Sequence, residues 1–316
     1  MIRLLVLLAV WLAGCSAPAA APPTASGSPK TRIAVVLPSA VDDLAWSQSM
    51  VDSLNALKQK DPNLEVAISD KMVSVADANA ALRDYADEGY DLVVAHGTQY
   101  GNGLFEVAAD FPEVSFAYGT ATDTRGARNV FAYDAAADQA GYVNGVLAAG
   151  LSQKGVLGVV GPVEAGDAKL YIDGFQAGAK ATRPDVKVLV AYTGSFSDTS
   201  QAAETASVQV QAGADVLTGS AQQVAGAINV AREKKLLWVG TQANQASLAP
   251  DQVVVCQTYD WTPVLQDILQ ERRQGRPGGK QYRLTYGNGL VSVFNPQVPV
   301  SEKVRASYDK ALREQK

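Results

Sequence analysis

Histidine and cysteine are nearly missing from this chain. Its 316 residues include one histidine, His96, and two cysteines, Cys15 and Cys256. Transition metals are held mainly by clusters of these two residue types, so the composition argues against a metal centre. A Ser-His-Asp catalytic site would have to use His96 itself, and the chain has no G-x-S-x-G segment. We therefore expect no metal, no cofactor and no enzymatic activity.

Positive charge is also scarce. The chain has 27 Lys and Arg residues against 32 Asp and Glu, a net charge of -5, and no long basic cluster. Because nucleic-acid-binding domains carry a basic surface, we expect no nucleic-acid partner. The 47% of hydrophobic and 19% of charged residues are ordinary for a globular chain of one or two domains with a sizeable core.

The N-terminal apolar run is too short to span a bilayer. Arg3 precedes this run, which covers residues 4–12. The end of the run and the three residues after it, Leu12-Ala13-Gly14-Cys15, resemble the lipobox of bacterial lipoproteins. This resemblance implies cleavage before Cys15 and acylation of its thiol. Residues 1–15 are then a lipoprotein signal peptide with its lipobox. Residues 16–30, rich in Ala, Pro, Ser, Gly and Thr, form a flexible tether.

A lipid anchor predicts a protein held at the cell membrane on its extracytoplasmic side. The alternative is an ordinary secretory signal with an incidental cysteine. Acylation of Cys15 leaves Cys256 without a partner, and the apolar neighbours of Cys256 predict a buried structural thiol.

From residue 31 onward, apolar runs of strand length alternate with segments of helical periodicity. The alternation is typical of parallel sheets covered by helices on both faces. About nine strands would be many for one open sheet, so two sheets in two lobes are the simpler arrangement. The runs fall at residues 33–37, 64–68, 92–95, 114–118, 156–160, 186–191, 216–218, 236–239 and 253–256.

The lobe boundary is expected near residues 129–134. A loop rich in Thr, Gly and Arg, residues 120–128, precedes it, and a helix over residues 135–151 would open the second lobe. Two similar lobes imply a cleft between them. Small ligands bind in such sheets at the carboxyl ends of the strands.

Trp46 opens a helix shortly after the first predicted strand. It lies on one stripe with Met50 and Leu54, so it is either a core tryptophan or a flat face at the mouth of the cleft. The backbone N–H groups at such a helix start are free to bind a ligand.

The residues that follow the predicted strands are mostly glycine, aromatic, or neutral and polar, and Asp134 and Glu164 are charged exceptions. Glycine lets the backbone approach a ligand, while amides and hydroxyls supply directional hydrogen bonds without net charge. This lining suits a neutral, partly aromatic solute. The candidate ligand-binding residues are Trp46, Ser47, Gln48, His96, Gly97, Thr98, Tyr118, Tyr133, Asp134, Phe196, Ser220 and Gln242.

His96 ends its strand beside Gly97. A neutral imidazole at this place either contacts a ligand or is satisfied within the protein. Residues 97–103 are rich in glycine, yet they lack the lysine and the terminal Ser or Thr of a phosphate-binding loop, so we reject a phosphate site.

Five short segments follow the lipobox in order. They are DLAWSQS at 43–49, FPEVSFA at 111–117, GFQAGA at 174–179, GSFSD at 194–198 and GADVL at 213–217. Together they resemble the basic membrane protein (BMP) family, the substrate-binding lipoproteins of ABC transporters. The resemblance extends from residue 31 to the C-terminal segment.

The resemblance implies a periplasmic-binding-protein type I fold. This is an α/β architecture of two Rossmann-like lobes with parallel sheets, three crossovers and a ligand cleft between the lobes. It implies an N-terminal lobe of residues 31–130 plus 261–281 and a C-terminal lobe of residues 131–260 plus 282–316. The implied partners are a small solute and an ABC permease in the membrane, with the protein acting as a monomer.

The resemblance also implies a class of ligand. Many members bind purine nucleosides, with an aromatic residue at the position of Trp46 stacked on the base. Polar groups at Ser47 and Gln48 would bond the edge of the base, and Phe196 in the other lobe would complete an aromatic sandwich.

Two departures from that pattern shift the expectation. Tyr118-Gly119-Thr120 replaces an acidic partner for ribose hydroxyls, and residues 241–245 lack the usual Asp. We therefore expect a purine nucleobase before a nucleoside. The alternatives are a different small aromatic solute, a sensory lipoprotein that uses the same cleft, and a hydrolase or ligase on a similar fold.

Overall fold

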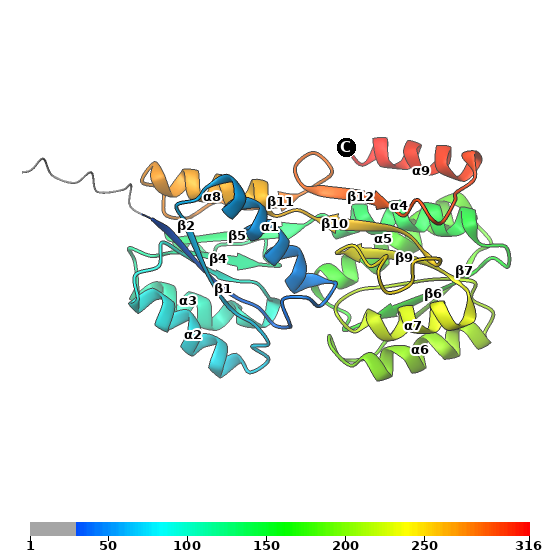
Figure 1. The fold of residues 1–316 in the computed structure, drawn as a ribbon, viewed down its shortest axis with the longest axis horizontal. Coiled ribbons are helices and arrows are strands. Elements are labelled where there is room, and N and C mark those ends of the chain that lie inside the picture. Colours follow the sequence, from blue (N-terminus) through cyan, green and yellow to red (C-terminus); the bar gives the residue numbers. More distant parts are fainter. Residues whose placement is uncertain (1–29) are drawn as a thin grey trace, which may run out of the picture.

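The computed structural model describes residues 30–316 and places them in two α/β lobes that lie side by side (Figure 1). The predicted signal segment, Cys15 and residues 16–29 of the predicted tether lie outside the described residues. Within residues 30–316, no helix is both long and apolar enough to cross a membrane.

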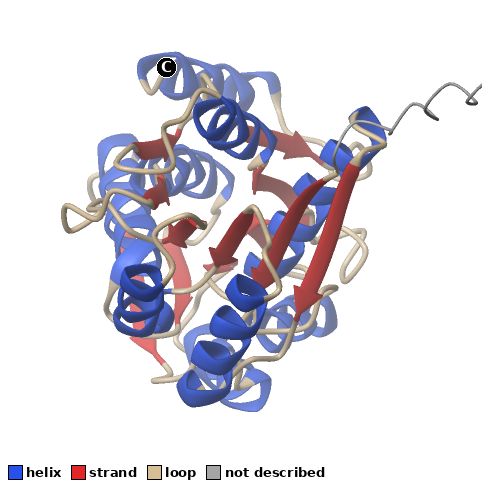
Figure 2. Cartoon of the chain, turned by 90° about the vertical axis from the view of Figure 1, so that its left-hand side faces the viewer, coloured by secondary structure: helices blue, strands red, loops and turns tan. Residues whose placement is uncertain are grey.

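The first lobe is built on a six-stranded parallel sheet of order β11-β5-β4-β3-β1-β2. Figure 2 shows these strands lying between helices. The strands are β1 (Thr31–Val36), β2 (Leu64–Ser69), β3 (Leu92–Ala95), β4 (Ser115–Gly119), β5 (Val130–Ala135) and β11 (Gln281–Leu284). The helices are α1 (Trp46–Lys60), α2 (Val75–Asp87), the 3-10 turn η1 (Thr98–Tyr100), α3 (Gly101–Asp110) and α8 (Thr262–Arg273).

Strand β1 explains why helices cover both faces of this sheet. Ile33 and Val35 pack in one apolar cluster with α1 and α8, whereas Ala34 and Val36 pack in another with α2 and α3. Successive side chains of a strand point to opposite faces, so an unbroken apolar run requires cover on both sides.

The second lobe repeats the arrangement with the sheet order β12-β10-β9-β8-β6-β7. Its last strand, β12, pairs antiparallel with β10. A wholly parallel sheet was predicted, so the structure departs from the prediction at this edge strand. The strands are β6 (Val156–Gly161), β7 (Lys187–Tyr192), β8 (Val216–Gly219), β9 (Leu237–Gln242), β10 (Val253–Tyr259) and β12 (Leu290–Phe294). The helices are α4 (Ala137–Leu151), α5 (Gly166–Thr182), α6 (Thr199–Gln211), α7 (Val224–Lys234) and α9 (Glu302–Glu314). Cys256 of β10 is a free, buried thiol, as its apolar neighbours predict.

The chain crosses between the lobes after β5, β10 and β11. Strands β5 and β11 both belong to the sheet of the first lobe, because β5 pairs with β4 and β11 pairs with β5. The sheet of the first lobe therefore extends to Ala135 and Leu284, beyond the predicted limits at residues 130 and 281. The predicted boundary cut through a strand.

Helices α4 and α5 approach each other closely through glycine. Gly141 and Gly145 of α4 face the backbone of α5, and Gly174 and Gly178 of α5 face the backbone of α4. A Cβ atom added at Gly174 would lie 2.1 Å from the carbonyl oxygen of Asp138. This contact seats α5 against α4 and so positions the first turn of α5 at the cleft.

We expect Gly174→Ala to destabilise the protein. Alanine is the better helix former, but the added methyl group must push α5 away from α4, and such overpacking costs about 1–3 kcal/mol. Urea denaturation measures the free energy of unfolding. Ala177→Ser, at an exposed position of the same helix, should stay within about 0.5 kcal/mol of the native protein. A Gly174→Ala variant as stable as the native protein would contradict the close packing.

Candidate functional site

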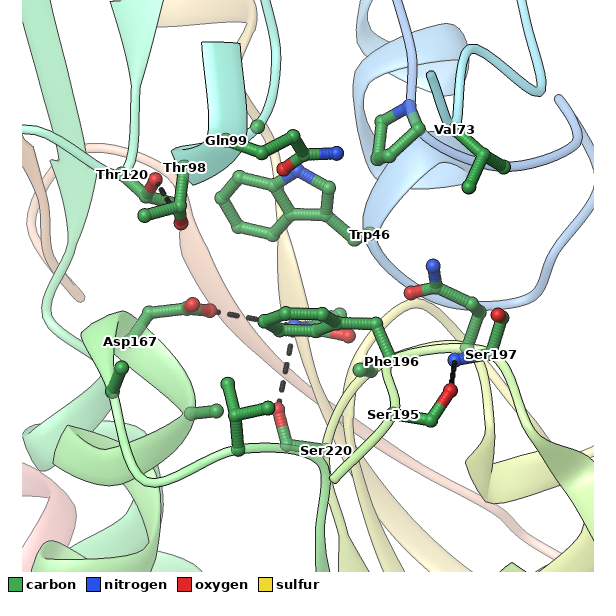
Figure 3. Close-up of a pocket in the computed structure, with 18 of the residues that line it drawn as sticks. Trp46, Val73, Thr98, Gln99, Thr120, Asp167, Ser195, Phe196, Ser197 and Ser220 are labelled. Atoms are coloured by element: carbon green, nitrogen blue, oxygen red, sulfur yellow. Dashed lines mark hydrogen bonds between the residues drawn. The ribbon is translucent and has the colours of Figure 1, made fainter. Parts of the chain in front are cut away.

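A cavity of about 490 Å³ lies between the lobes. The first lobe lines it with the segments that follow β1 to β4, and the second lobe with the segments that follow β6 to β8 and the end of β9. These are the carboxyl ends of parallel strands, where open α/β sheets bind ligands. Figure 3 shows Trp46 of the first lobe above Phe196 of the second, with Asp167 to one side.

Six of the predicted site residues line this cavity: Trp46, Gly97, Thr98, Phe196, Ser220 and Gln242. The other six do not line it: Ser47, Gln48, His96, Tyr118, Tyr133 and Asp134. Each of these six is engaged within the protein.

The start of α1 is closed by the side chain of Asp43. Its carboxylate accepts hydrogen bonds from the backbone N–H groups of Ala45, Ser47 and Gln48. The side-chain oxygen of Gln48 in turn accepts from the backbone N–H of Leu44. The expectation that the N–H groups of this helix start are free for a ligand is therefore wrong, because a carboxylate occupies them.

His96 lies behind Trp46, away from the cavity. The two rings are stacked, with centroids 4.2 Å apart and planes 6° from parallel. Trp46 Nε1 donates to the carbonyl oxygen of His96 (3.0 Å), and His96 Nε2 lies 3.1 Å from the carbonyl oxygen of Trp46. A carbonyl can only accept, so Nε2 carries the ring proton, and Nδ1 accepts from the Tyr133 hydroxyl at 2.7 Å.

Burial lowers the pKa of His96 to about 3, so the imidazole is neutral at physiological pH. It holds the indole of Trp46 in place and covers one of its faces. Trp46 itself is 6% exposed and offers its remaining surface to the cavity.

Tyr118 and Asp134 also bond within the protein. The Tyr118 hydroxyl donates to the carbonyl oxygen of Thr98 at 2.7 Å, and Asp134 accepts from the backbone N–H of Ala135. Tyr118 thus supports a residue of the lining, and it is not part of the lining.

Asp167, in the first turn of α5, is a lining residue that the sequence reasoning missed. The sequence analysis singled out Glu164 as the charged residue of this loop, but Glu164 is exposed and forms an ion pair with Lys169. Asp167 is 9% exposed and makes no ion pair among the described residues. Carboxylates are common in first helical turns, so its position alone gave no signal.

The pKa of Asp167 is raised from 3.8 to about 6, chiefly by burial and then by the charge of Asp134. Since the folded-state pKa lies above the ordinary one, protonated Asp167 favours the fold below pH 3.8, and this contribution is lost as the pH rises to about 6. The ionised carboxylate therefore destabilises the folded protein at neutral pH.

Gln242 ends β9 beside Asp167. Its Nε2 donates to Asp167 Oδ2 over 3.4 Å and to Ser220 Oγ over 3.5 Å, both long contacts. Its Oε1 is buried and has no hydrogen-bond partner in the described structure. The backbone of Gln242 has φ 73°, a left-handed conformation that non-glycine residues adopt rarely and at a cost.

Comparison with known proteins places the chain in a family. The family described as ABC transporter substrate-binding protein PnrA-like (Bmp) matches residues 30–315. A purine-binding protein of Brucella abortus is 29% identical over 225 residues, which cover 70% of this chain and 63% of that relative's length. The transcriptional activator protein Med of Bacillus subtilis is 24% identical over 271 residues, 84% of this chain and 83% of that protein.

Solved structures agree on the fold. An ABC transporter solute-binding protein of Conexibacter woesei, 24% identical, aligns with a TM-score of 0.74 over 90% of this chain and 95% of that one. The matched family extends over almost all of the described residues. The chain belongs to the PnrA-like (Bmp) family of ABC transporter substrate-binding proteins.

Proposed function

We propose that this protein captures a small planar solute, a purine nucleobase or nucleoside, in the interlobe cavity and delivers it to an ABC permease. The observation that carries the proposal is the pair of aromatic side chains, Trp46 and Phe196, which line one cavity from opposite lobes. The volume of about 490 Å³ lies in the usual range for sites of small organic ligands. The purine-binding relative from Brucella abortus supports the choice of solute.

The charges of the lining favour an uncharged purine over a nucleotide. Among the described residues that line the cavity, none is Lys, Arg or His, and the one ionisable side chain is Asp167. A phosphate group would enter a site without cations and beside a carboxylate, which is unfavourable in a partly dry cavity. A base or a nucleoside carries no such charge.

The attachment and assembly follow from the same proposal. Acylation of Cys15 would hold the two lobes at the extracytoplasmic face of the membrane, within reach of the permease. The protein would act as a monomer there, since both walls of the cavity come from one chain.

A second role rests on the similarity to Med, which extends over 84% of this chain. In that role the solute-bound lobes would contact a regulatory partner, and the cavity would serve as a sensor. Affinity capture from detergent-solubilised membranes, with and without the solute, separates the two roles: recovery of a permease favours uptake, and recovery of a signalling protein without a permease favours sensing.

Native protein purified as residues 31–316 should release a purine when it is unfolded. Mass spectrometry identifies the released solute, and calorimetry with the emptied protein checks its affinity. Binding of a ligand to the folded state also raises the melting temperature. If no purine is released and no purine base or nucleoside raises the melting temperature, the proposed class of ligand is wrong.

Phe196→Ala should weaken purine binding about fivefold or more, since stacking a base on an aromatic ring contributes about 1–3 kcal/mol. The melting temperature of the empty protein should hardly change, because Phe196 is 41% exposed. Val208→Ala is the matched control, since Val208 is 64% exposed in the same lobe and does not line the cavity. Equal affinity in the two variants would remove Phe196 from the site.

A further inference from the structure

We propose that Asp167 and Gln242 form an acceptor pair that selects solutes with two adjacent hydrogen-bond donors. The inference rests on the proposed function, because it assigns a polar contact to a planar solute held in the same cavity. Two parts of a purine nucleoside have the required chemistry. They are the N–H groups on one edge of guanine and the neighbouring hydroxyls of ribose.

The first argument is the unpaired oxygen of Gln242. Its residue is 3% exposed and its Oε1 has no partner in the described structure, although most buried polar atoms are hydrogen-bonded. Gln242 lines the cavity, and its amide is held only by two long contacts, so a rotation of the side chain would turn Oε1 toward a donor on the solute. An acceptor of this kind gains more from a ligand donor than an atom that is already satisfied.

The second argument is the carboxylate beside it. Asp167 accepts from backbone N–H groups and, over 3.4 Å, from Gln242, but it forms no ion pair among the described residues. An ionised carboxylate accepts about four hydrogen bonds, so this one can still accept about one more, from a solute. A charge-assisted bond from one solute donor to this carboxylate is short and strong, and the neighbouring donor would bond Oε1 of Gln242 beside it.

The third argument is the balance of donors and acceptors at this point of the wall. The amide nitrogen of Gln242 is directed to Asp167 and Ser220, which leaves acceptors to face the solute. The N1 atom of adenine is itself an acceptor and would be repelled by the carboxylate. The guanine edge presents N1–H and an amino group side by side, and a ribose presents two hydroxyls.

Asp167→Asn should lower the affinity for solutes with the donor pair about tenfold or more, because an amide replaces a charged acceptor and turns an NH₂ group toward the donors. Calorimetry with guanine, adenine, guanosine and 2′-deoxyguanosine measures this effect. Asp173→Asn, an exposed substitution on the same helix, should leave all affinities unchanged. The affinity of the native protein for the donor-pair solutes should also decrease as the pH is lowered through about 6, because protonation removes the charged acceptor. The affinity of Asp167→Asn should not change over this pH range.

The four probes distinguish the two sources of donors. A selective loss for guanine and both guanine nucleosides, with adenine spared, assigns the base edge. A selective loss for guanosine, with 2′-deoxyguanosine and both bases spared, assigns the ribose hydroxyls. Equal binding of every probe by Asp167→Asn and native protein would overturn the inference and leave the proposed function standing. No binding of any purine by native protein would overturn both.

Asp167→Asn should also melt at a higher temperature than the native protein at pH 7.5, by at least about 2 °C, because it removes a buried charge. The groups that act on this carboxylate are Asp134 at the end of β5, Tyr259 at the end of β10 and the amide of Gln242. The difference should vanish near pH 4, where the native carboxyl is protonated. A variant that melts lower at pH 7.5 would show that the carboxylate holds the fold together and would overturn its assignment to the solute.

Discussion

The stacked pair of Trp46 and His96 is the contact on which the binding wall depends. Each residue bonds the backbone carbonyl of the other, so neither ring can rotate without losing a hydrogen bond and the stacking contact together. The pair packs edge-on against Trp261, and the ring of Tyr133 lies nearly parallel to His96 at its edge, where the hydroxyl bonds Nδ1. Tyr133 lies in β5, shortly before the first crossover, and Trp261 lies at the second crossover, between β10 and α8. The wall of the cavity and the connections between the lobes are therefore one aromatic cluster.

The two lobes contribute different groups to the lining of the cavity. The first lobe offers a flat indole whose position is fixed by burial and by two backbone hydrogen bonds. The second lobe offers Phe196, partly exposed, and a group of polar atoms that the protein satisfies incompletely. A rigid apolar face hardly lowers the stability of the protein when no solute is bound. A buried carboxylate and an unpaired amide oxygen, in contrast, destabilise the solute-free protein. Binding sites commonly retain such unfavourable groups because a ligand restores their hydrogen bonds.

The sequence predicted the strands well because an apolar run buried on two faces is a local signal. Each of the nine predicted runs forms a strand within three residues of its expected limits. Strand β11 was not predicted, because it lies at the edge of its sheet and has the mixed polar and apolar sequence Gln281-Tyr282-Arg283-Leu284. Strand β5 is apolar, but its run continues directly into the first crossover, so the sequence marked it as a boundary.

The lining of the cavity was predicted in part, because the lining segments follow the predicted strands. The loops that follow the strands could be named from the chain, and Trp46, Phe196 and Gln242 are among their residues that line the cavity. The role of His96 could not be predicted, because its partners Trp46 and Tyr133 are 50 and 37 residues away along the chain. The sequence also gives no measure of burial, and burial is what separates Asp167 from the exposed Glu164 three residues earlier.

The electrostatics of the cleft follow from how the helix starts are used. A free helix start attracts anions, and many α/β sites bind phosphate in this way. Here Asp43 occupies the start of α1, and Asp167 places a carboxylate in the first turn of α5. Two of the helix starts beside the cleft therefore carry a negative side chain of the protein. With no cation in the described lining to compensate, the cavity favours solutes that donate hydrogen bonds and disfavours solutes that bring negative charge. For the proposed purine solute, the boundary of specificity would then fall at the phosphate group, between nucleosides and nucleotides.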